Sequence, residues 1–252
     1  MRPLSASQVQ AYLACPLQYR FRYVDRLPKP WRAGALAFGT SVHSAVEWFH
    51  RERLAGRSPT GDAVLDVFSA DWYAQGLELL VLREGESQAS LADKGRGMLR
   101  CYVAEATQAP AAVEQRCEVD LVDPETGEDL ELRLRGFIDL VEADGTGVDL
   151  QTAGRTVNAN DLERHLQLTI YALAVFLEHQ KIPALRLDLL MKTQRPRLER
   201  LPTSRTVEDL SWVARLVQQV AFAIESGHFF PSPSWRCSEC EYFAHCQAWR
   251  GE

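Results

Sequence analysis

The sequence lacks any long apolar run. No segment reaches the ~18 uninterrupted apolar residues that a bilayer span requires, so we expect no membrane segment. The first residues also lack the apolar stretch of a secretory signal, which favours a cytoplasmic location. The chain contains no repeat of fixed period, no low-complexity tract and no Walker motif. Repeat architectures and P-loop ATPase activity are therefore excluded.

Positive charge is not in excess either. The chain of 252 residues carries 28 Lys and Arg against 34 Asp and Glu, which gives a formal net charge of −6. A basic surface over the whole protein is absent, and any contact with nucleic acid must come from a local patch. Apolar residues make up 46% and charged residues 25%, which is typical of globular proteins and excludes collagen-like, disordered and coiled-coil classes.

Hydrophobic periodicity and turn residues predict an α/β fold with a central mixed sheet flanked by helices. We expect one domain, residues 1–252, divided into a mainly helical part at 1–110, a sheet core at 111–205, and a helix and tail at 206–252. The predicted helices are 5–23, 39–53, 62–82, 91–106, 160–179 and 206–226. The predicted strands are 113–122, 130–141, 148–150, and a hairpin of 185–191 with 198–201.

Half of the six cysteines gather in the tail. They are Cys237, Cys240 and Cys246. Where thiols stay reduced, such spacing suggests metal ligands before disulfides. Cys15 is a candidate fourth ligand, which would join the two ends of the chain. Zinc and an iron–sulfur cluster both suit four cysteines, and spacing alone does not decide between them. Three unrelated buried thiols are the remaining alternative, while Cys101 and Cys117 are expected in the core.

Two aspartates lie near the ends of consecutive predicted strands. Neighbouring strands would bring Asp139 and Asp149 close together, and their carboxylates would repel unless a hard cation such as Mg²⁺ or Mn²⁺ lay between them. The alternative is that both aspartates solvate strand ends. His43 shares a helix face with Glu47 and either completes the metal shell or is a satisfied interior histidine. Gln167 and Tyr171 are four residues apart on the predicted helix that follows Asp149, so they lie on the same face of it. This face either points into a cleft or is simply half-buried.

Basic residues also gather in two short segments. The first holds Arg20, Arg22, Arg26, Lys29 and Arg32, and the second holds Lys192, Arg195, Arg197, Arg200 and Arg205. Four aromatic residues accompany the first segment, and we expect them to be able to stack on unpaired bases. They are Tyr19, Phe21, Tyr23 and Trp31. The first segment is the preferred candidate for DNA contact, although solvated charged faces are the usual fate of such runs.

Together, these segments resemble the RecB-type branch of the PD-(D/E)xK nuclease superfamily. The motifs occur in the family's order along nearly the whole chain, with the weakest support from 58 to 110. They are the opening helix with Cys15, Phe38-Gly-Thr-Ser-Val-His43, Gly136-Phe-Ile-Asp139, Val148-Asp149-Leu-Gln151-Thr152, Gln167-Leu-Thr-Ile-Tyr171 and the three tail cysteines. Stand-alone RecB-family exonucleases and CRISPR-associated adaptation exonucleases are similar in layout.

The resemblance implies a restriction-endonuclease-like core and two separate metal sites. A four-iron four-sulfur cluster, rather than zinc, is implied for Cys15, Cys237, Cys240 and Cys246. Mg²⁺ or Mn²⁺ is implied at His43, Asp139, Asp149 and a backbone carbonyl near Leu150. Catalytic roles are implied for Asp139, Asp149, Gln151, Gln167 and Tyr171. The implied partners are DNA, in particular single-stranded DNA bound at Arg20, Arg22 and Arg26, and a helicase or a CRISPR-adaptation protein.

Gln151 departs from the family pattern, which has lysine at this position. The lysine orients the attacking water and stabilises developing negative charge, whereas an amide brings neither positive charge nor a titratable proton. Losing such a group costs on the order of 10²–10⁴ in rate. Three explanations are open: an engineered inactive variant, which we favour because every other motif is present; a natural pseudonuclease; or a cation that has taken over the role, with Lys192 as the candidate.

Three functions follow from these observations. The first is a metal-dependent deoxyribonuclease, most simply a single-strand exonuclease, that acts in repair, recombination or CRISPR adaptation. The second is a non-catalytic DNA-binding pseudonuclease or scaffold subunit with the same fold. The third is a structural protein held together by zinc.

Overall fold

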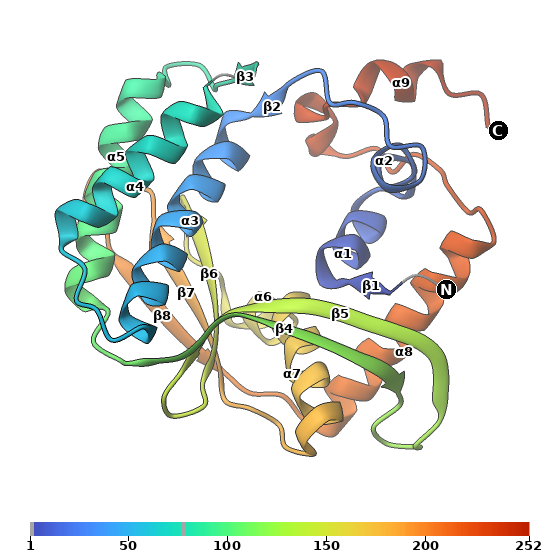
Figure 1. Ribbon diagram of the computed structural model, residues 1–252. Helices are drawn as coiled ribbons and strands as arrows, with labels where there is room; N and C mark the ends of the chain where they lie inside the picture. Colours follow the sequence, from blue (N-terminus) through green and yellow to red (C-terminus); the bar gives the residue numbers. More distant parts are fainter. Residues whose placement is uncertain (1–2, 77–78, 252) are drawn as a thin grey trace.

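The computed structural model describes residues 3–76 and 79–251 (Figure 1). Its centre is a mixed sheet in the order β1-β5-β6-β7-β8, with β4 on β5 as well. The strands are β1 Leu4–Ser5, β4 Pro110–Val122, β5 Asp129–Glu142, β6 Gly147–Ala153, β7 Leu185–Met191 and β8 Leu198–Thr203. The β1–β5 and β6–β7 pairs are parallel, and β4–β5, β5–β6 and β7–β8 are antiparallel. The predicted mixed sheet and the predicted β7–β8 hairpin are thus confirmed.

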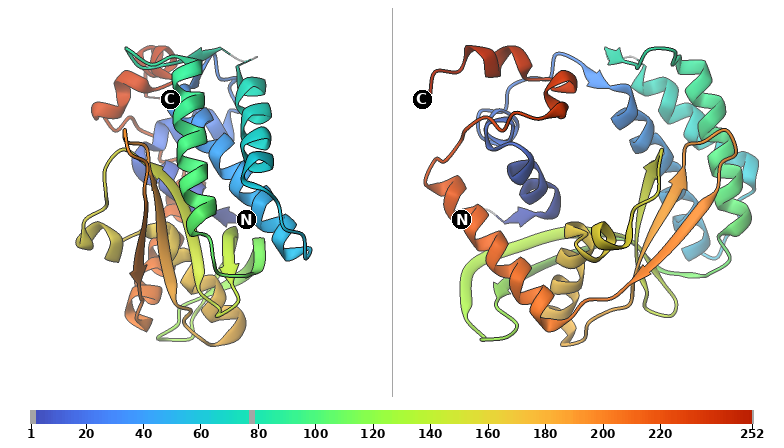
Figure 2. Two further views of the ribbon diagram at one scale, coloured as in Figure 1. Left: turned by 90° about the vertical axis from the view of Figure 1, so that its left-hand side faces the viewer. Right: turned by 180° about the vertical axis from the view of Figure 1, so that it is seen from behind.

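Helices cover both faces of this sheet. On β7, consecutive residues Leu189 and Leu190 are fully buried but belong to different hydrophobic cores. Because successive side chains of a strand point to opposite faces, each face must carry its own core. One core is closed by α7 and α8, and the other by α3, α4 and α5. Figure 2 shows the sheet from two further sides between these helical groups.

Three long helices form the layer that is built from the first half of the chain. They are α3 Gly34–Leu54, α4 Gly61–Gln75 and α5 Gln88–Glu105. Their contact is aromatic, since Phe38 packs edge-on against Phe68 and Trp72. Helix α4 ends at Gln75 and not at 82 as predicted, and a short parallel pair of strands, β2 Arg32–Ala33 and β3 Leu80–Val81, closes the end of the layer.

The first predicted helix is broken in the structure. Helix α1 Ala6–Ala14 opens with the predicted capping box of Ser5 and Gln8. At Cys15 the backbone is extended, with φ −164° and ψ 107°, and the chain continues as α2 Pro16–Tyr19 and a π-helical turn η1 Arg20–Val24. Proline disfavours helical dihedrals in the residue before it, so Pro16 explains the break. The prediction of one helix over 5–23 is therefore wrong.

The predicted helix at 160–179 is also divided, into α6 Ala159–Glu163 and α7 Leu166–His179. His165 lies between them and caps α7, because its Nδ1 accepts the backbone N–H of Leu168 at 3.4 Å. Helix α8 Val207–Glu225 follows the prediction closely and begins with a capping box of Thr206 and Asp209. Helices α7 and α8 pack on the same face of β4 and β5 as α1 does.

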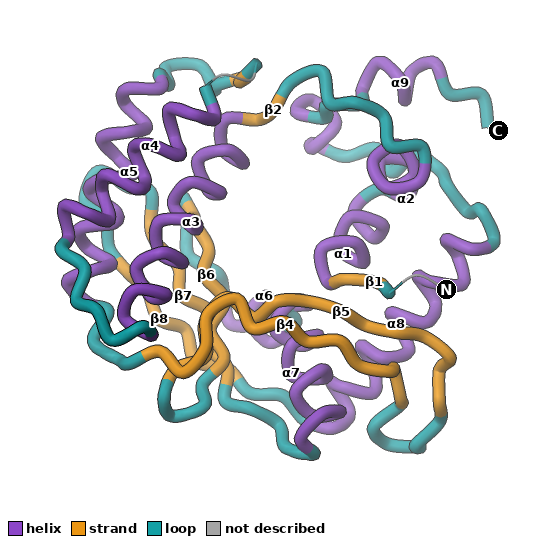
Figure 3. Tube along the Cα trace, in the orientation of Figure 1, coloured by secondary structure: helices purple, strands orange, loops and turns teal. Residues whose placement is uncertain are grey.

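The tail returns to the beginning of the chain. It contains the 3₁₀ turn η2 Trp235–Glu239 and helix α9 Phe243–Ala248. Tyr242 is buried against Leu17 and Phe21 of the opening helices, and its hydroxyl donates to the carbonyl of Leu27 at 3.2 Å. In Figure 3, the tail and the opening helices lie together at the upper right, across from α3 to α5 at the upper left, and β4 and β5 run below. No helix among the described residues is long and apolar enough to cross a membrane.

Candidate active site

The two aspartates of the predicted site come from a short antiparallel pair. The ladder between β5 and β6 pairs Leu140 with Val148 and Val141 with Gly147, so Asp139 and Asp149 follow at the next opposed position. There the ladder ends, and the backbone N–H of Leu150 donates to Oδ2 of Asp139 at 2.9 Å. The strands thus separate at the point where both carboxylates emerge.

The carboxylate of Asp149 is held by two amides. Its Oδ1 accepts from Nε2 of Gln167 at 2.7 Å, and its Oδ2 accepts from Nε2 of Gln151 at 2.8 Å. Only 1% of Asp149 is exposed. Burial raises the pKa of Asp149, as does the charge of Asp139, and the hydrogen bond from Gln151 opposes this only in part. A buried carboxylate of this kind is stabilised in its charged form by an added cation.

His43, on helix α3, lies against the carboxylate of Asp139. Its Nε2 lies 3.2 Å from Oδ2 of Asp139 and 3.6 Å from Oε1 of Glu114. The hydrogen bond to Asp139 raises the pKa of His43 to about 9, against the opposing effect of burial, and the charges of Asp139, Glu114 and Glu47 raise it further. Without a metal ion, the imidazole is therefore protonated at neutral pH and balances an otherwise negative cluster, and a metal ion bound at Nε2 would replace this proton.

Glu114 belongs to the same cluster, and sequence reasoning missed it. The donor atoms of His43, Glu47 and Glu114 all lie within 4.8 Å of one another. Oε1 of Glu114 is buried and accepts no hydrogen bond from any described residue. The backbone at Glu114 has φ +49°, a left-handed conformation that is unusual for a residue in a strand. No spacing signal in the sequence marks this position.

Gln151 makes a second contact within the site. Its Nε2 lies 3.1 Å from Nε2 of His165, whose role here was also missed by sequence reasoning. Burial lowers the pKa of His165, so its imidazole is neutral at physiological pH. Gln167 also contacts the hydroxyl of Tyr171, and burial raises the pKa of that phenol. Gln151, Gln167 and Tyr171 thus form one connected group around Asp149.

Lys192 is occupied elsewhere. Its Nζ forms an ion pair with Glu86 at 3.2 Å and lies 5.4 Å from the centre of the Phe38 ring. Its contacts therefore lie in the layer of α3 to α5 and not at Asp149. This arrangement does not favour Lys192 as a replacement for the family lysine.

The donor set of the acidic cluster suits a hard divalent cation. Carboxylate oxygens, one imidazole and an unpartnered buried oxygen on Glu114 are the ligands that Mg²⁺ and Mn²⁺ accept. The cluster lines an open cavity of about 580 Å³. Its lining residues include His43, Glu47, Glu114, Leu150 and Gln151.

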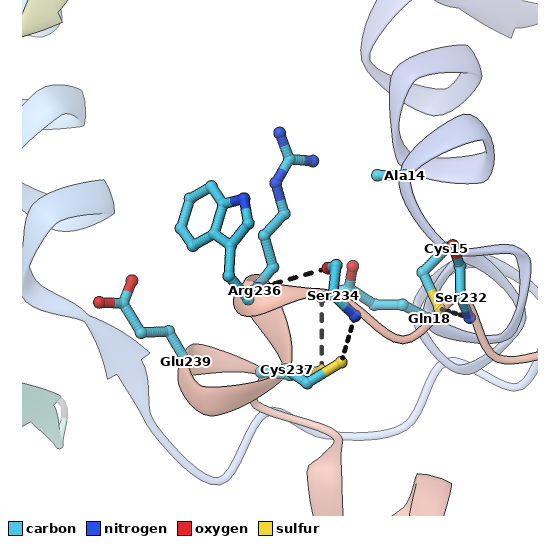
Figure 4. Close-up of a pocket in the computed structure, with 10 residues that line it drawn as sticks. Ala14, Cys15, Gln18, Ser232, Ser234, Arg236, Cys237 and Glu239 are labelled. Atoms are coloured by element: carbon cyan, nitrogen blue, oxygen red, sulfur yellow. Dashed lines mark hydrogen bonds between the residues drawn. The ribbon is translucent and has the colours of Figure 1, made fainter.

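The four cysteines predicted to bind a cluster line one cavity of about 270 Å³. Figure 4 shows Cys15, at the end of α1, and Cys237, in the tail, on the wall of a cavity that adjoins it. Backbone N–H groups point at both sulfurs, from Ser232 to Cys15 at 3.4 Å and from Ser234 to Cys237 at 3.3 Å. Hydrogen bonds of this kind are common at cluster thiolates.

The spacing of the sulfurs can be compared with that of a zinc site. A tetrahedral zinc site with bonds of about 2.3 Å places its sulfurs about 3.8 Å apart. Within residues 3–76 and 79–251, no three of these sulfurs lie within 4.8 Å of one another, since His43, Glu47 and Glu114 are the one group that meets this limit. The sulfurs therefore line a common cavity without forming a compact tetrahedral set.

The first basic segment is only partly available to a ligand. Arg20 forms an ion pair with Asp25 at 3.2 Å, whereas Arg22 and Arg26 are exposed. The prediction that Tyr19 and Phe21 stack on bases is wrong, because both rings are buried. Tyr19 packs against other aromatic rings of the core, and Phe21 packs against the tail.

Comparison with known proteins agrees with this geometry. The sequence profile of the PD-(D/E)XK nuclease superfamily matches residues 3–247. The chain therefore belongs to the PD-(D/E)XK nuclease superfamily, whose members are metal-dependent nucleases. No curated protein matches the sequence.

Two solved structures are similar. One is a protein of Eubacterium rectale that has been described provisionally as an exonuclease, with 13% identity, a TM-score of 0.63, and coverage of 99% of this chain and 89% of that one. At 13% identity, this match shows a similar fold alone. The other is SSO0001, with 12% identity, coverage of 96% and 93%, and a TM-score of 0.37, on which no argument rests.

Proposed function

We propose that this protein is a nuclease that binds single-stranded DNA and uses Mg²⁺ or Mn²⁺, most simply as an exonuclease in repair, recombination or CRISPR adaptation. The observation that carries the proposal is the close approach of side chains from different elements beside an open cavity. His43 lies 3.2 Å from Asp139 and 3.6 Å from Glu114, Asp149 follows opposite Asp139 on the neighbouring strand, and His43 and Glu114 line the cavity. Such a cluster has too much negative charge for a structural role and is completed by a divalent cation.

The cation would be held by His43, Asp139, Asp149 and the carbonyl of Leu150, with Glu114 beside them. When bound, a divalent cation supplies positive charge at the phosphate and lowers the pKa of a nearby water. Gln167 fixes Asp149 in position through its amide, and Tyr171 in turn contacts that amide. These two residues would act by positioning the carboxylate.

We infer that Gln151 makes this chain a slow or inactive form of the nuclease. The amide is directed at Asp149 and His165, so it offers an attacking water no positive charge. An engineered change is the explanation we favour, and natural loss of activity is the alternative. We expect Gln151→Lys to raise Mg²⁺- or Mn²⁺-dependent cleavage of single-stranded DNA by about 10²–10⁴-fold.

Asp149→Ala in the Gln151→Lys background is the matched control, and it should abolish the gained activity. Release of nucleotides from a labelled oligonucleotide measures both. Absence of cleavage by the Gln151→Lys protein, with folding and Mn²⁺ binding intact, would favour the second function, a non-catalytic DNA-binding or scaffold subunit with a helicase or CRISPR-adaptation protein as its partner.

We further propose that Cys15, Cys237, Cys240 and Cys246 hold a four-iron four-sulfur cluster. The shared cavity and the N–H groups directed at two of the sulfurs support it. Anaerobic preparation followed by iron analysis and visible absorption tests the assignment. Stoichiometric zinc without iron would contradict it and favour the third function, a structural protein held together by zinc.

A further inference from the structure

A second cavity adjoins the one that holds the acidic cluster. It has a volume of about 690 Å³, and the two cavities share Leu36 and Thr40 of helix α3 in their walls. The two cavities therefore lie next to each other along helix α3. A polymer whose scissile phosphate lies at His43 would have its neighbouring units close to the second cavity.

The two cavities have opposite electrostatic character. Glu47 and Glu114 line the first, whereas Arg22, Lys29 and Arg32 line the second. Among the described residues, no aspartate or glutamate lines the second cavity. The acidic cavity suits a metal ion, and the basic cavity suits a phosphate that no metal ion neutralises.

The cations of the second cavity are held in different ways. Arg22 forms no hydrogen bond or ion pair within residues 3–76 and 79–251, and its guanidinium lies 5.2 Å from the centre of the Tyr23 ring. Lys29 pairs with Glu241 at 3.6 Å. Arg32 donates to the hydroxyl of Thr40 at 3.0 Å, on the shared wall. Arg22 is thus the most available donor for a phosphate.

Trp31 supplies an aromatic surface in the same cavity. It is half-buried, follows Pro30 and lies beside Arg22 and Lys29 in the lining. Of the four aromatic residues of this segment, Tyr19 and Phe21 are buried in the core, so they are not available to a ligand. An indole next to cations, of which Arg22 has no ion pair among the described residues, is the combination that binds unpaired nucleotides, by stacking of the base and contact with the phosphate.

We propose that this second cavity is a subsite for one unpaired nucleotide next to the scissile phosphate. Trp31 stacks on its base, and Arg22 and Lys29 contact its phosphate. A paired base has its faces covered by its neighbours in the stack, so the subsite selects single-stranded over double-stranded DNA. The proposal rests on the proposed function, and it assigns the strand preference to Trp31 and Arg22.

Equilibrium binding tests the subsite with the full chain. The probe is a fluorescein-labelled oligothymidylate in Mg²⁺ buffer, with the Gln151 protein, which we expect to cleave it slowly or not at all. We expect Trp31→Ala to weaken binding about 5- to 150-fold, and Trp31→Phe, which keeps an aromatic face, to weaken it much less. Trp31→Leu keeps apolar volume without an aromatic ring and should behave like Trp31→Ala.

Two control variants test whether the loss of any exposed tryptophan, or of any exposed positive charge, weakens binding to the oligonucleotide. Trp212→Ala removes a tryptophan that is 60% exposed on α8, and Lys181→Ala removes an exposed cation. Both should leave the affinity within about twofold. Arg22→Ala should weaken binding and also reduce its salt dependence by about one released counterion.

The outcomes separate the subsite from the proposed function. Unchanged affinity in Trp31→Ala and Trp31→Leu, with DNA and Mn²⁺ binding intact, would overturn the subsite and leave the nuclease proposal standing. Absence of Mn²⁺ binding to the parent chain in calorimetry would overturn the proposed function instead. Photocrosslinking of a 5-iododeoxyuridine oligonucleotide to Trp31, found by peptide mass spectrometry, would support the stacking contact directly.

Discussion

At the scale of single residues, Gln151 shows what an amide can and cannot replace. Its Nε2 bears two hydrogens, and two acceptors lie within reach, Asp149 at 2.8 Å and His165 at 3.1 Å. A lysine would add a third donor and a full positive charge beside a carboxylate whose pKa is raised by burial. The amide preserves the position of Asp149 but not the charge balance of the site.

His50 allows a pH prediction away from this site. Burial lowers the pKa of His50 to about 4, and the charge of Arg53 contributes. Its Nε2 forms a 2.7 Å hydrogen bond with the hydroxyl of Tyr102. Because the folded state disfavours the protonated form, the unfolded chain takes up the proton first as the pH falls below 6.5. The free energy of unfolding should therefore drop by about 3 kcal/mol between pH 6.5 and 4 on account of this residue.

Chemical denaturation across this pH range measures the effect. His50→Gln cannot titrate, so its stability should fall less steeply than that of the parent chain. His179→Gln alters an exposed histidine and should leave the parent profile unchanged. Parallel profiles of the parent chain and His50→Gln would contradict the prediction.

Some residues of the site could be found from sequence, and others could not. Asp139 and Asp149 carry recognisable spacing and turn signals, and their neighbourhood follows from strand pairing. Glu114 carries no such signal, because its place in the cluster depends on a left-handed backbone within a strand. His165 was missed because histidine is not among the usual helix-capping residues.

At the scale of elements, helix α5 holds two glycines with opposite roles. A Cβ at Gly95 would overlap the ring of Phe68 on α4, whereas a Cβ at Gly97 would lie 3.4 Å from Pro196, in ordinary contact. We expect Gly95→Ala to destabilise the protein by about 1–3 kcal/mol through overpacking. Gly97→Ala should stabilise it by up to about 1 kcal/mol, because alanine favours the helix.

Thermal or chemical unfolding of the two variants gives the comparison. Phe68→Leu should restore part of the loss in Gly95→Ala, since a smaller side chain makes room for the methyl group. Equal effects of the two glycine substitutions would show that helix propensity, and not the α4–α5 contact, decides the outcome.

Element boundaries were predictable where local signals were strong. The helices predicted to begin at 5 and 206 have their N-terminal caps there in the structure, each with a capping box, and the predicted hairpin of 185–191 with 198–201 is present as β7 and β8. The break at Cys15 was missed because hydrophobic periodicity continues through it, although Pro16 carries the signal. The end of α4 at Gln75 depends on the β2–β3 pair, which no short pattern indicates.

At the scale of the whole molecule, the two ends of the chain are packed together. Tyr12 donates to the carbonyl of His228 at 2.7 Å, and Tyr242 is buried against the opening helices. A cluster bound by Cys15 and the tail cysteines would close a loop of nearly the whole chain and so reduce the entropy of the unfolded state. In the sequence, only the cysteines indicate that the tail lies against the opening helices. The other contacts of the tail have no spacing signal.

We expect Cys15→Ala to lower the melting temperature of the anaerobically prepared protein by several degrees and to reduce its iron content. Cys101→Ala removes a half-buried thiol on α5 that bonds to Glu105, and it should preserve iron and lower the melting temperature much less. Equal iron content in the parent chain and Cys15→Ala would contradict the role of Cys15 as a ligand.

The ion pair between Lys29 and Glu241 has a consequence for oxidation. Glu241 follows Cys240 directly, and Gln18 donates to Glu241 at 3.2 Å from the opening helices. If the four cysteines hold the proposed iron–sulfur cluster, its loss to oxidants would loosen the segment that carries Glu241 and so release Lys29 from its ion pair. The oxidation state of the tail would then change the charge that the second cavity presents to a phosphate.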